Sequence, residues 1–368
     1  MQTPTRRATF AILTAAAVLA ASQASAQTPS TKAVHDRLLV LDSHVDVLLP
    51  GTNPRYFAPD GTSFTSLDKL KAGGVDALVY AVAVSTGPRT AEGYAAAATE
   101  AKAKLAAIQA LPQESGGAIQ LARTPADVRR IVAGGKIAVL TGFLNAYSLG
   151  EDLAAFDPYF AGGVRVAGLT HAGNNAFADS SRPQAGTGAE HGGLSPLGKA
   201  AIARFNDLGV LVDVSQLTPD GLRQVLAITR APVVASHSAA RALVDVTRNL
   251  SDAELDAIKA NGGVVQVPAF NSYLAAKPAG QDEQPKATVK AYVDHIDYIA
   301  KRIGVDHVGV GTDFNHGSGI VGFADASQAP AVTAELLARG YSQADLAKIW
   351  GENFLRVLGA AQAAAKAS

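Results

Sequence analysis

Short apolar runs alternate with helix-like segments along most of the chain. Each run is nearly continuous and lacks the polar alternation of a half-exposed strand, so we expect strands that are buried on both faces. The runs cover residues 38–42, 75–84, 137–142, 164–170, 210–215, 232–236, 263–268 and 307–312.

Helix signals fill the segments between these runs. Ser251 and Glu254 form a capping box, and three Ser-Pro or Thr-Pro pairs place a proline in a first helical turn. The segments predicted to be helical are 92–111, a helix that begins at Pro125, 153–160, 196–208, 219–228, 252–262, 288–303, 331–339 and 342–358.

The chain of 368 residues therefore alternates eight predicted strands with helices. This order favours an α/β fold, and in particular a (β/α)8 barrel of the TIM type. A doubly wound open sheet is the alternative, but no Gly-x-Gly-x-x-Gly motif follows the first strand. No internal repeat or second-domain linker interrupts the pattern, so we expect a single barrel domain over residues 27–368.

The first 26 residues have the pattern of a cleaved signal peptide. Arg6 and Arg7 precede a short apolar run, and Ala24-Ser25-Ala26 is an A-x-A cleavage site, so the mature chain is predicted to begin at Gln27. The paired arginines leave both the twin-arginine and the ordinary secretory route open. No later run reaches the ~20 apolar residues that a membrane span needs. We therefore expect an exported protein, periplasmic or extracellular, without a membrane anchor.

Net charge and cysteine content limit the kinds of ligand and of metal site that we expect. The chain has 32 Lys and Arg against 32 Asp and Glu, and removal of residues 1–26, which hold two arginines and no acid, leaves 30 against 32, or −2. This balance gives no indication of nucleic-acid binding. The absence of cysteine excludes disulfides and thiolate ligands, so a metal would be held by His, Asp, Glu or backbone oxygen.

Polar side chains gather where the predicted strands end. His44 and Asp46 are two residues apart and therefore on one side of an extended chain, while His171, His237 and Asp313 follow the fourth, sixth and eighth strands. Because a barrel brings the carboxyl ends of its strands to one rim, we expect these groups to meet in an active site. Imidazole and carboxylate ligands suit a divalent cation such as zinc.

Several motifs carry these residues in the same order as a known family. They are Asp42-Ser43-His44-Val45-Asp46, Gly168-Leu169-Thr170-His171, Leu194-Ser195-Pro196-Leu197-Gly198, Ala235-Ser236-His237-Ser238 with Arg248-Asn249-Leu250, Gly309-Val310-Gly311-Thr312-Asp313-Phe314 and Gly351-Glu352-Asn353-Phe354-Leu355-Arg356-Val357. Over nearly the whole mature chain they resemble the membrane (renal) dipeptidase family, which belongs to the amidohydrolase superfamily.

The resemblance implies a dipeptide hydrolase on a barrel with two bridged zinc ions. By that resemblance, His44 and Asp46 would hold the first metal and His237 would be a ligand of the second. Asp313 would take a proton from the attacking water and give it to the leaving amine.

The resemblance also assigns the substrate contacts. His171 would polarise the scissile carbonyl group or stabilise its developing negative charge. Arg248 would bind the C-terminal carboxylate, a role that suits a bidentate guanidinium. Asn145 and Tyr147 are further candidates for the lining of the substrate pocket. His316, just beyond Asp313, is interpreted as a solvated loop histidine, with a metal-ligand or substrate-contact role as the alternative.

Two positions depart from the family pattern. Leu144 stands where the bridging glutamate would be, and Gln216 stands where a second-metal histidine would be. Leucine has no lone pair, and an amide oxygen is a poor zinc ligand. The prediction is therefore one zinc ion, held by His44, Asp46 and Asp313, with Gln216 or His237 as a conceivable additional ligand.

Three functions remain open from the sequence. The first is a single-metal hydrolase of dipeptides or N-acyl amino acids, small molecules with a free carboxylate. The second is a metal-free binding protein on the same barrel, and the third is a two-metal dipeptidase with unforeseen ligands. A homodimer is a further expectation, because dimers occur in the family that the chain resembles.

Overall fold

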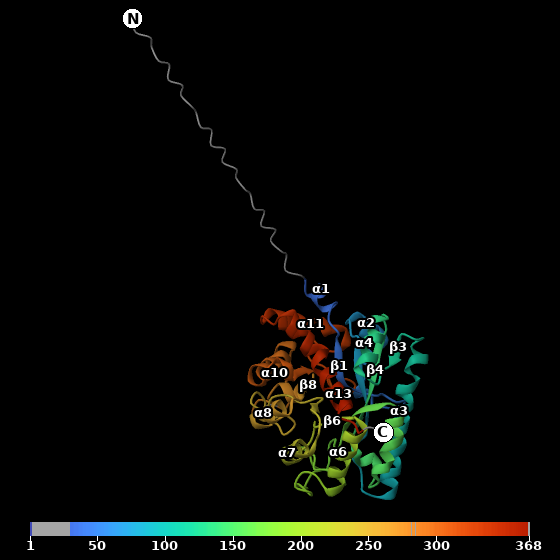
Figure 1. Cartoon of the computed structure of the whole chain (residues 1–368). Coiled ribbons are helices and arrows are strands. Elements are labelled where there is room, and N and C mark those ends of the chain that lie inside the picture. The colour runs from blue at the N-terminus through green and yellow to red at the C-terminus, as the bar shows by residue number, and fades with distance from the viewer. Residues whose placement is uncertain (2–29, 281, 284, 367–368) are drawn as a thin grey trace.

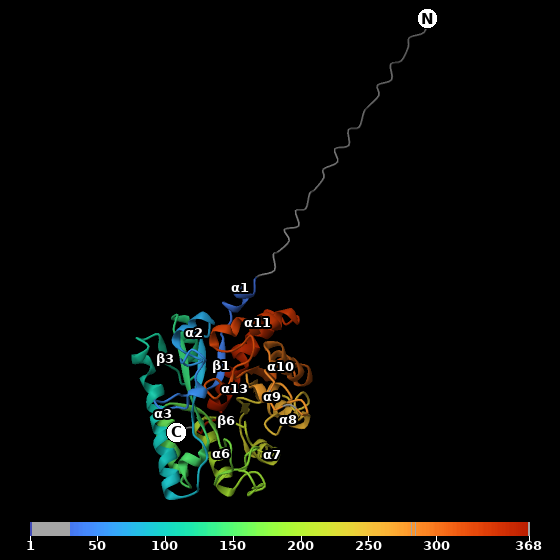
Figure 2. The same ribbon diagram turned by 180° about the vertical axis from the view of Figure 1, so that it is seen from behind.

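Eight parallel strands form a nearly closed barrel surrounded by helices (Figure 1, Figure 2). The structure is a computed structural model, which describes residue 1 and residues 30–280, 282–283 and 285–366. The predicted cleavage site of the signal peptide, residues 24–26, lies outside the described residues. In order around the barrel the strands are β1 (Leu41–Asp46), β2 (Ala77–Ala83), β4 (Ile137–Leu144), β5 (Val164–Gly168), β6 (Leu211–Asp213), β7 (Val234–Ala235), β8 (Val264–Val267) and β9 (Val308–Val310).

Main-chain contacts between the first and last strands close the ring. The amide of Asp46 donates to the carbonyl oxygen of Phe314, and the amide of Asp313 donates to that of His44, both at 3.0 Å. All seven neighbouring pairs along the path from β1 to β9 are parallel. The predicted (β/α)8 barrel is therefore confirmed, and the open sheet is excluded.

Helices follow the strands of the barrel on its outside (Figure 1). A π-helical turn at Lys348–Glu352 joins the last two helices, where the sequence predicts one helix over 342–358. The helices are α1 (Thr31–His35), α2 (Leu67–Ala72), α3 (Ala91–Glu114), α4 (Pro125–Ala133), α5 (Asp157–Ala161), α6 (Pro196–Leu208), α7 (Pro219–Ile228), α8 (Asp252–Asn261), α9 (Asn271–Leu274), α10 (Val289–Ile303), α11 (Ala329–Ala338), α12 (Gln343–Ala347) and α13 (Asn353–Ala363).

The first strand lies further along the chain than predicted. β1 contains His44 and Asp46 instead of ending before them. The buried carboxylate of Asp42 accepts from the amide and the hydroxyl of Thr312, at 2.9 and 2.5 Å, so this polar residue has partners inside the barrel. The pairing of β1 with β2 shifts register between Asp42 and Val45, which interrupts simple alternation just before Asp46. A short strand that the sequence did not predict, β3 (Ile119–Leu121), pairs with β4 outside the ring.

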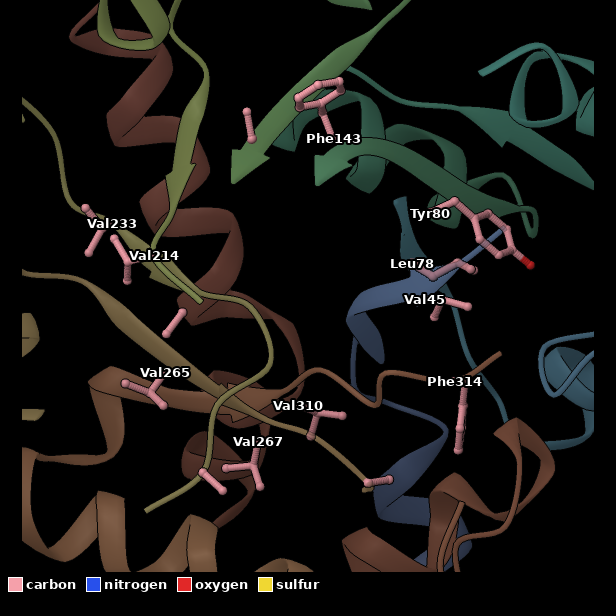
Figure 3. Close-up of a cluster of buried hydrophobic side chains, with 14 of the residues drawn as sticks. Val45, Leu78, Tyr80, Phe143, Val214, Val233, Val265, Val267, Val310 and Phe314 are labelled. Carbon is pink, nitrogen blue, oxygen red and sulfur yellow. The ribbon is translucent and has the colours of Figure 1, made fainter. Parts of the chain in front are cut away.

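Apolar side chains fill the barrel and the space between strands and helices. Figure 3 shows part of the main cluster, with side chains from β1, β2, β4, β8 and β9. A second cluster joins the first halves of the strands to α13, whose Phe354 and Leu358 are 1% and 0% exposed. Each such side chain contributes roughly 1.5–3 kcal/mol by burial. Because α13 covers the end where the strands begin, the other end is left for the candidate site.

Within the described part of the chain, no helix combines the length and the apolarity needed to cross a bilayer.

Candidate metal and substrate site

His44 and Asp46 lie at the centre of the candidate site. They are 4% and 7% exposed, and Nε2 of His44 lies 3.5 Å from Oδ1 of Asp46 and 3.9 Å from Oδ1 of Asp313. Neither this Nε2 nor the Asp46 Oδ1 has a hydrogen-bond partner in the described structure. A buried polar atom without a partner costs about 1–3 kcal/mol. Their convergence therefore indicates a place for a cation, and His44, Asp46 and Asp313 could hold it.

An unusual backbone conformation places several residues of this rim. Asp313 has a φ of 60°, and the same left-handed conformation occurs at Asn145, Gln216 and Asn315. These four are the non-glycine residues with positive φ in the described chain, and each follows a strand at the carboxyl end of the barrel. Such strained conformations persist where the surroundings hold them, and they cluster at functional sites.

His316 contacts the outer oxygen of Asp46. Its Nδ1 lies 2.8 Å from Oδ2 of Asp46, its ring stacks on that of Tyr56 with centroids 5.3 Å apart, and its side chain is 24% exposed. The interpretation of His316 as a solvated loop histidine is therefore wrong. Because His316 holds Oδ2, the other oxygen of Asp46 remains directed at His44.

Burial and neighbouring charges shift the pKa values of the four ionisable groups around His44. Burial alone would raise the pKa of the Asp46 carboxyl, but the His316 and His44 imidazoles outweigh it and hold that pKa well below its usual range. The same carboxylate raises the pKa of His316 to about 9, against the effect of burial. Burial raises the pKa of Asp313. For His44, burial lowers the pKa, yet the carboxylates of Asp46 and Asp313 bring it above the usual value. Asp46 is therefore charged at neutral pH, and Asp313 is suited to take up a proton.

A chain of hydrogen bonds runs from Arg182 to Asp213 beside this group. Nη2 of Arg182 donates to Oε1 of Gln216 at 3.0 Å, and Nε2 of Gln216 donates to Nε2 of His237 at 3.1 Å. Nδ1 of His237 lies 2.7 Å from the hydroxyl of Ser236, which lies 2.5 Å from Oδ2 of Asp213. All donors can point from the guanidinium toward the carboxylate, so the bonds reinforce one another. We name this set the relay.

The hydrogen bonds of the relay determine which atoms of His237 and Gln216 are free to bind a metal ion. Ligand atoms of His44, His237 and Asp313 lie within 4.8 Å of one another, and the rings of His44 and His237 stack at 4.0 Å. However, both ring nitrogens of His237 have partners in the relay, and the oxygen of Gln216 is held by Arg182. Asp213 also accepts from the amide of Ser236, at 3.0 Å, so its carboxylate forms structural hydrogen bonds at the end of the barrel.

Leu144 fills the rim with an apolar side chain. It is 2% exposed and forms a small cluster with Ala81 and Ala83. A Cβ atom on Gly168 would lie 2.9 Å from its Cδ1 atom, so the side chain packs closely against the end of β5. The position that the resemblance assigns to a bridging glutamate therefore offers no ligand.

Two buried residues keep polar atoms free on the substrate side. His171 is 8% exposed, its Nδ1 has no partner, and burial lowers its pKa well below the usual value. It lines a cavity of about 210 Å³ together with Asp46 and His316. Arg248 is 4% exposed, donates through Nη2 to the carbonyl oxygen of His237 at 2.9 Å, and has an unpartnered Nε. A larger open hollow, of about 960 Å³, lies between α8 and α10, away from this rim.

Asn145 and Tyr147 are placed differently from expectation. The amide of Asn145 donates to the carbonyl oxygen of Val84 and the hydroxyl of Thr86, each at 2.9 Å, and its oxygen accepts from the amide of Tyr147. The hydroxyl of Tyr147 donates to the carbonyl oxygen of Pro88 at 2.6 Å. These contacts shape the loop after β4 and leave neither residue a free polar atom for a ligand.

The sequence analysis did not find one residue of the site, Arg182, and one contact, that of His316 with Asp46. Arg182 was not singled out, because it lies in an irregular loop without a periodic pattern or a motif. The contact of His316 with Asp46 depends on the turns at Asp313 and Asn315, which no sequence pattern indicates. The one available signal was the closeness of His316 to Asp313 in the chain.

The fold and the position of these groups define a (β/α)8 barrel whose polar residues meet at the carboxyl ends of the strands. Within that class, the chain belongs to the membrane dipeptidase family. The family described as membrane dipeptidase (peptidase family M19) matches residues 29–368. The resemblance seen in the motifs is therefore confirmed.

Solved and curated relatives agree with this assignment. The probable dipeptidase PvdM from Pseudomonas aeruginosa is 38% identical, with 91% of this chain and 98% of that protein covered and a TM-score of 0.85. A metallopeptidase from Rhodobacter sphaeroides, liganded with a phosphinate mimic of the dipeptide L-Ala-D-Ala, is 26% identical, with 88% and 99% covered and a TM-score of 0.77. Dipeptidase tcpJ from Claviceps purpurea (strain 20.1) is 37% identical over 241 residues, 65% of this chain and 55% of its own length. The chain thus spans little more than half of that curated relative.

Proposed function

We propose that the protein is an exported hydrolase that uses one zinc ion to cleave the amide bond of dipeptides or N-acyl amino acids. The observation that carries the proposal is the pair of buried, unpartnered atoms His44 Nε2 and Asp46 Oδ1, 3.5 Å apart, with Asp313 beside them. Three protein ligands with an open position make a workable catalytic zinc site. A zinc ion held there supplies a Lewis acid that lowers the pKa of water and polarises a carbonyl group.

The donors fit one metal ion and not two. The place of the bridging ligand is taken by the apolar Leu144. Gln216 has both ends of its amide engaged, and the ring nitrogens of His237 are bonded within the relay. A second divalent ion would have to displace these contacts and would gain no carboxylate in return.

Asp313 is proposed to move the proton of the reaction. As water adds to the carbonyl carbon, its carboxylate accepts the proton and later gives it to the nitrogen of the leaving amine as the C–N bond breaks. The raised pKa of this buried carboxyl suits both steps, because a stronger base is easier to protonate.

His171 and Arg248 are proposed to hold the substrate. Burial keeps the His171 imidazole neutral, and its free nitrogen can contact the scissile carbonyl group. Arg248 has no carboxylate partner in the described chain and can bind a free carboxylate of the substrate through two N–H groups. Together they favour small molecules with an amide bond near a terminal carboxylate.

Substitution of Asp313 by asparagine tests the proposal. Asparagine tolerates the left-handed backbone at this position, so the fold should persist. We expect hydrolysis of a dipeptide panel to fall by roughly 10²–10⁴-fold, as for loss of a general acid and base. Asp220→Asn, on the exposed surface of α7, is the matched control and should keep full activity. Full activity of Asp313→Asn, or a purified protein that lacks metal and hydrolyses none of the panel, would overturn the proposal.

A metal-free binding protein is the second candidate. It is favoured by the pairing of Asp46 with His316 and of His237 with Gln216, since both contacts satisfy polar groups without a metal. This function predicts thermal stabilisation by N-acetyl-D-alanine that disappears in Arg248→Ala. Hydrolysis of the same compound by the wild-type protein would reject it.

A further inference from the structure

Arg182 is a partly buried arginine whose charge has no carboxylate partner in the described chain. Its Nη2 donates to Oε1 of Gln216, and its Nε is buried without an acceptor. A guanidinium has five N–H donors. Apart from the bond of the side chain to Gln216, these donors have no protein acceptor among the described residues.

The main chain holds Arg182 firmly against the site. Its amide donates to the hydroxyl of Ser180 at 3.1 Å, and that hydroxyl donates to the carbonyl oxygen of His171 at 2.5 Å. The amide of Ser181 donates to the carbonyl oxygen of Gln216 at 2.8 Å. The loop of Arg182 is thereby tied to the two strand ends that carry His171 and Gln216.

The charge of Arg182 acts on the substrate side of the rim. After burial, which is the largest cause, it contributes to the lowered pKa of His171 and of Arg248. Through Gln216 it reaches His237, beside the place that the family resemblance gives to a second metal. A fixed positive charge is therefore hydrogen-bonded to Gln216, one of the two positions at which this chain departs from the family pattern of second-metal ligands.

We propose that Arg182 takes over the task of that second cation and donates hydrogen bonds to the oxygen of the scissile amide. This inference rests on the proposed hydrolase function and adds a residue to it. When water adds to the carbonyl carbon, the C=O π pair moves to the oxygen, and Arg182 stabilises the negative charge without giving up a proton. The proton of the water goes to Asp313 and from there to the amine nitrogen as the C–N bond breaks.

Two probes that differ at the reacting centre test the role of Arg182 by isothermal titration calorimetry of the zinc-loaded protein. The phosphinate mimic of L-Ala-D-Ala carries charged oxygens at that centre, whereas N-acetyl-D-alanine carries a neutral amide and the same terminal carboxylate. We expect Arg182→Met to weaken phosphinate binding by roughly 10–100-fold, as for loss of a hydrogen bond to a charged group. Binding of N-acetyl-D-alanine should change by less than about threefold.

Matched variants distinguish a direct contact of Arg182 with the ligand from an indirect effect on the structure of the site. Arg182→Lys keeps the charge and should retain part of the phosphinate affinity. Gln216→Met breaks the relay but leaves the guanidinium, so its loss should be smaller than that of Arg182→Met. Arg248→Met should weaken both probes, and Arg204→Met, a surface arginine paired with Asp157, should weaken neither.

Each other outcome decides against the proposal. Unchanged phosphinate affinity in Arg182→Met, equal losses for both probes, or an equal loss in Gln216→Met would overturn the contact while the hydrolase function stands. A wild-type protein that takes up no zinc and prefers neither probe would overturn the hydrolase function, and the role of Arg182 with it.

A zinc titration gives an independent readout. If Arg182 replaces a cation, it should oppose a second one when ligands are restored. We expect the Leu144→Glu and Gln216→His double variant to bind a second zinc at least roughly tenfold more weakly than the same variant with Arg182→Met added. Equal affinities would contradict the assignment.

Discussion

Replacement of Arg248 by methionine separates a binding role from a structural role. The Arg248 side chain donates to the carbonyl oxygen of His237, at 2.9 Å, and its Cζ atom lies 5.1 Å from the centre of the Tyr273 ring. Burial lowers the pKa of Arg248, which means that its charge is desolvated. Arg248 therefore carries a desolvated charge that is not paired with a carboxylate at hydrogen-bond distance in the described chain.

The expected change in the free energy of unfolding of Arg248→Met is the sum of opposing contributions. Loss of the bond to a charged donor costs about 1.5–3 kcal/mol, and loss of the cation–π contact costs about 0.5–2 kcal/mol. Removal of a buried, unpaired charge returns several kcal/mol. We therefore expect the free energy of unfolding to change by less than about 2 kcal/mol, whereas breaking a structural buried ion pair would cost about 3–5 kcal/mol. Loss of two bonds to a substrate carboxylate should weaken binding by roughly 10²–10⁴-fold.

Two measurements on Arg248→Met check this reasoning. Urea unfolding at pH 7 gives the free energy of unfolding, and calorimetric titration with N-acetyl-D-alanine gives the affinity. Arg204→Met serves as the control in both. A fall in the free energy of unfolding of more than about 3 kcal/mol, or an affinity within about threefold of wild type, would refute the binding role.

Three further predictions concern the metal, the pH dependence and the N-terminus. Leu144→Glu combined with Gln216→His should add a second zinc in a metal titration, and failure to do so would show that these positions are misplaced. Burial raises the pKa of Asp76 to about 6, above its ordinary value of 3.8, although its bond to the amide of Val40 opposes the shift. Ionisation therefore destabilises the fold, by at most about 3 kcal/mol, as pH rises from about 4 to about 6. Urea unfolding at pH 4 and pH 7 measures this effect. The free energy of unfolding should fall less between the two pH values in Asp76→Asn than in the wild-type protein. An equal fall in both proteins would contradict the role of Asp76. If the protein is exported as proposed, N-terminal sequencing of the mature chain should begin at Gln27, and an uncleaved start would contradict export through the signal peptide.

The barrel could be predicted from the sequence because its strands are continuous apolar runs and its helices have clear starts. The helices α6 and α7 begin at the prolines that mark their first turns. The full extent of β1 could not be predicted, because its second half pairs not only with β2 but also with the segment at Phe314, which is far away in the sequence. The strand β3 has three residues, too few for a hydrophobic pattern.

The candidate site was only partly predictable. The rim position of His44, Asp46 and Asp313 follows from barrel geometry, since all three stand at strand ends. The relay and the contact of His316 depend on left-handed backbone turns at Gln216 and in the loop of Asp313, and side-chain partners in such loops do not follow from periodicity. For that reason the sequence shows the departures from the family pattern at Leu144 and Gln216 but not the contact of Arg182 with Gln216.

The metal content of protein purified without added zinc tests the central claim most directly. Inductively coupled plasma mass spectrometry should find about one zinc per chain, as a three-ligand site would hold, and His44→Ala should lose it. Two equivalents of zinc, or none, would contradict a single-metal hydrolase built around His44 and Asp46.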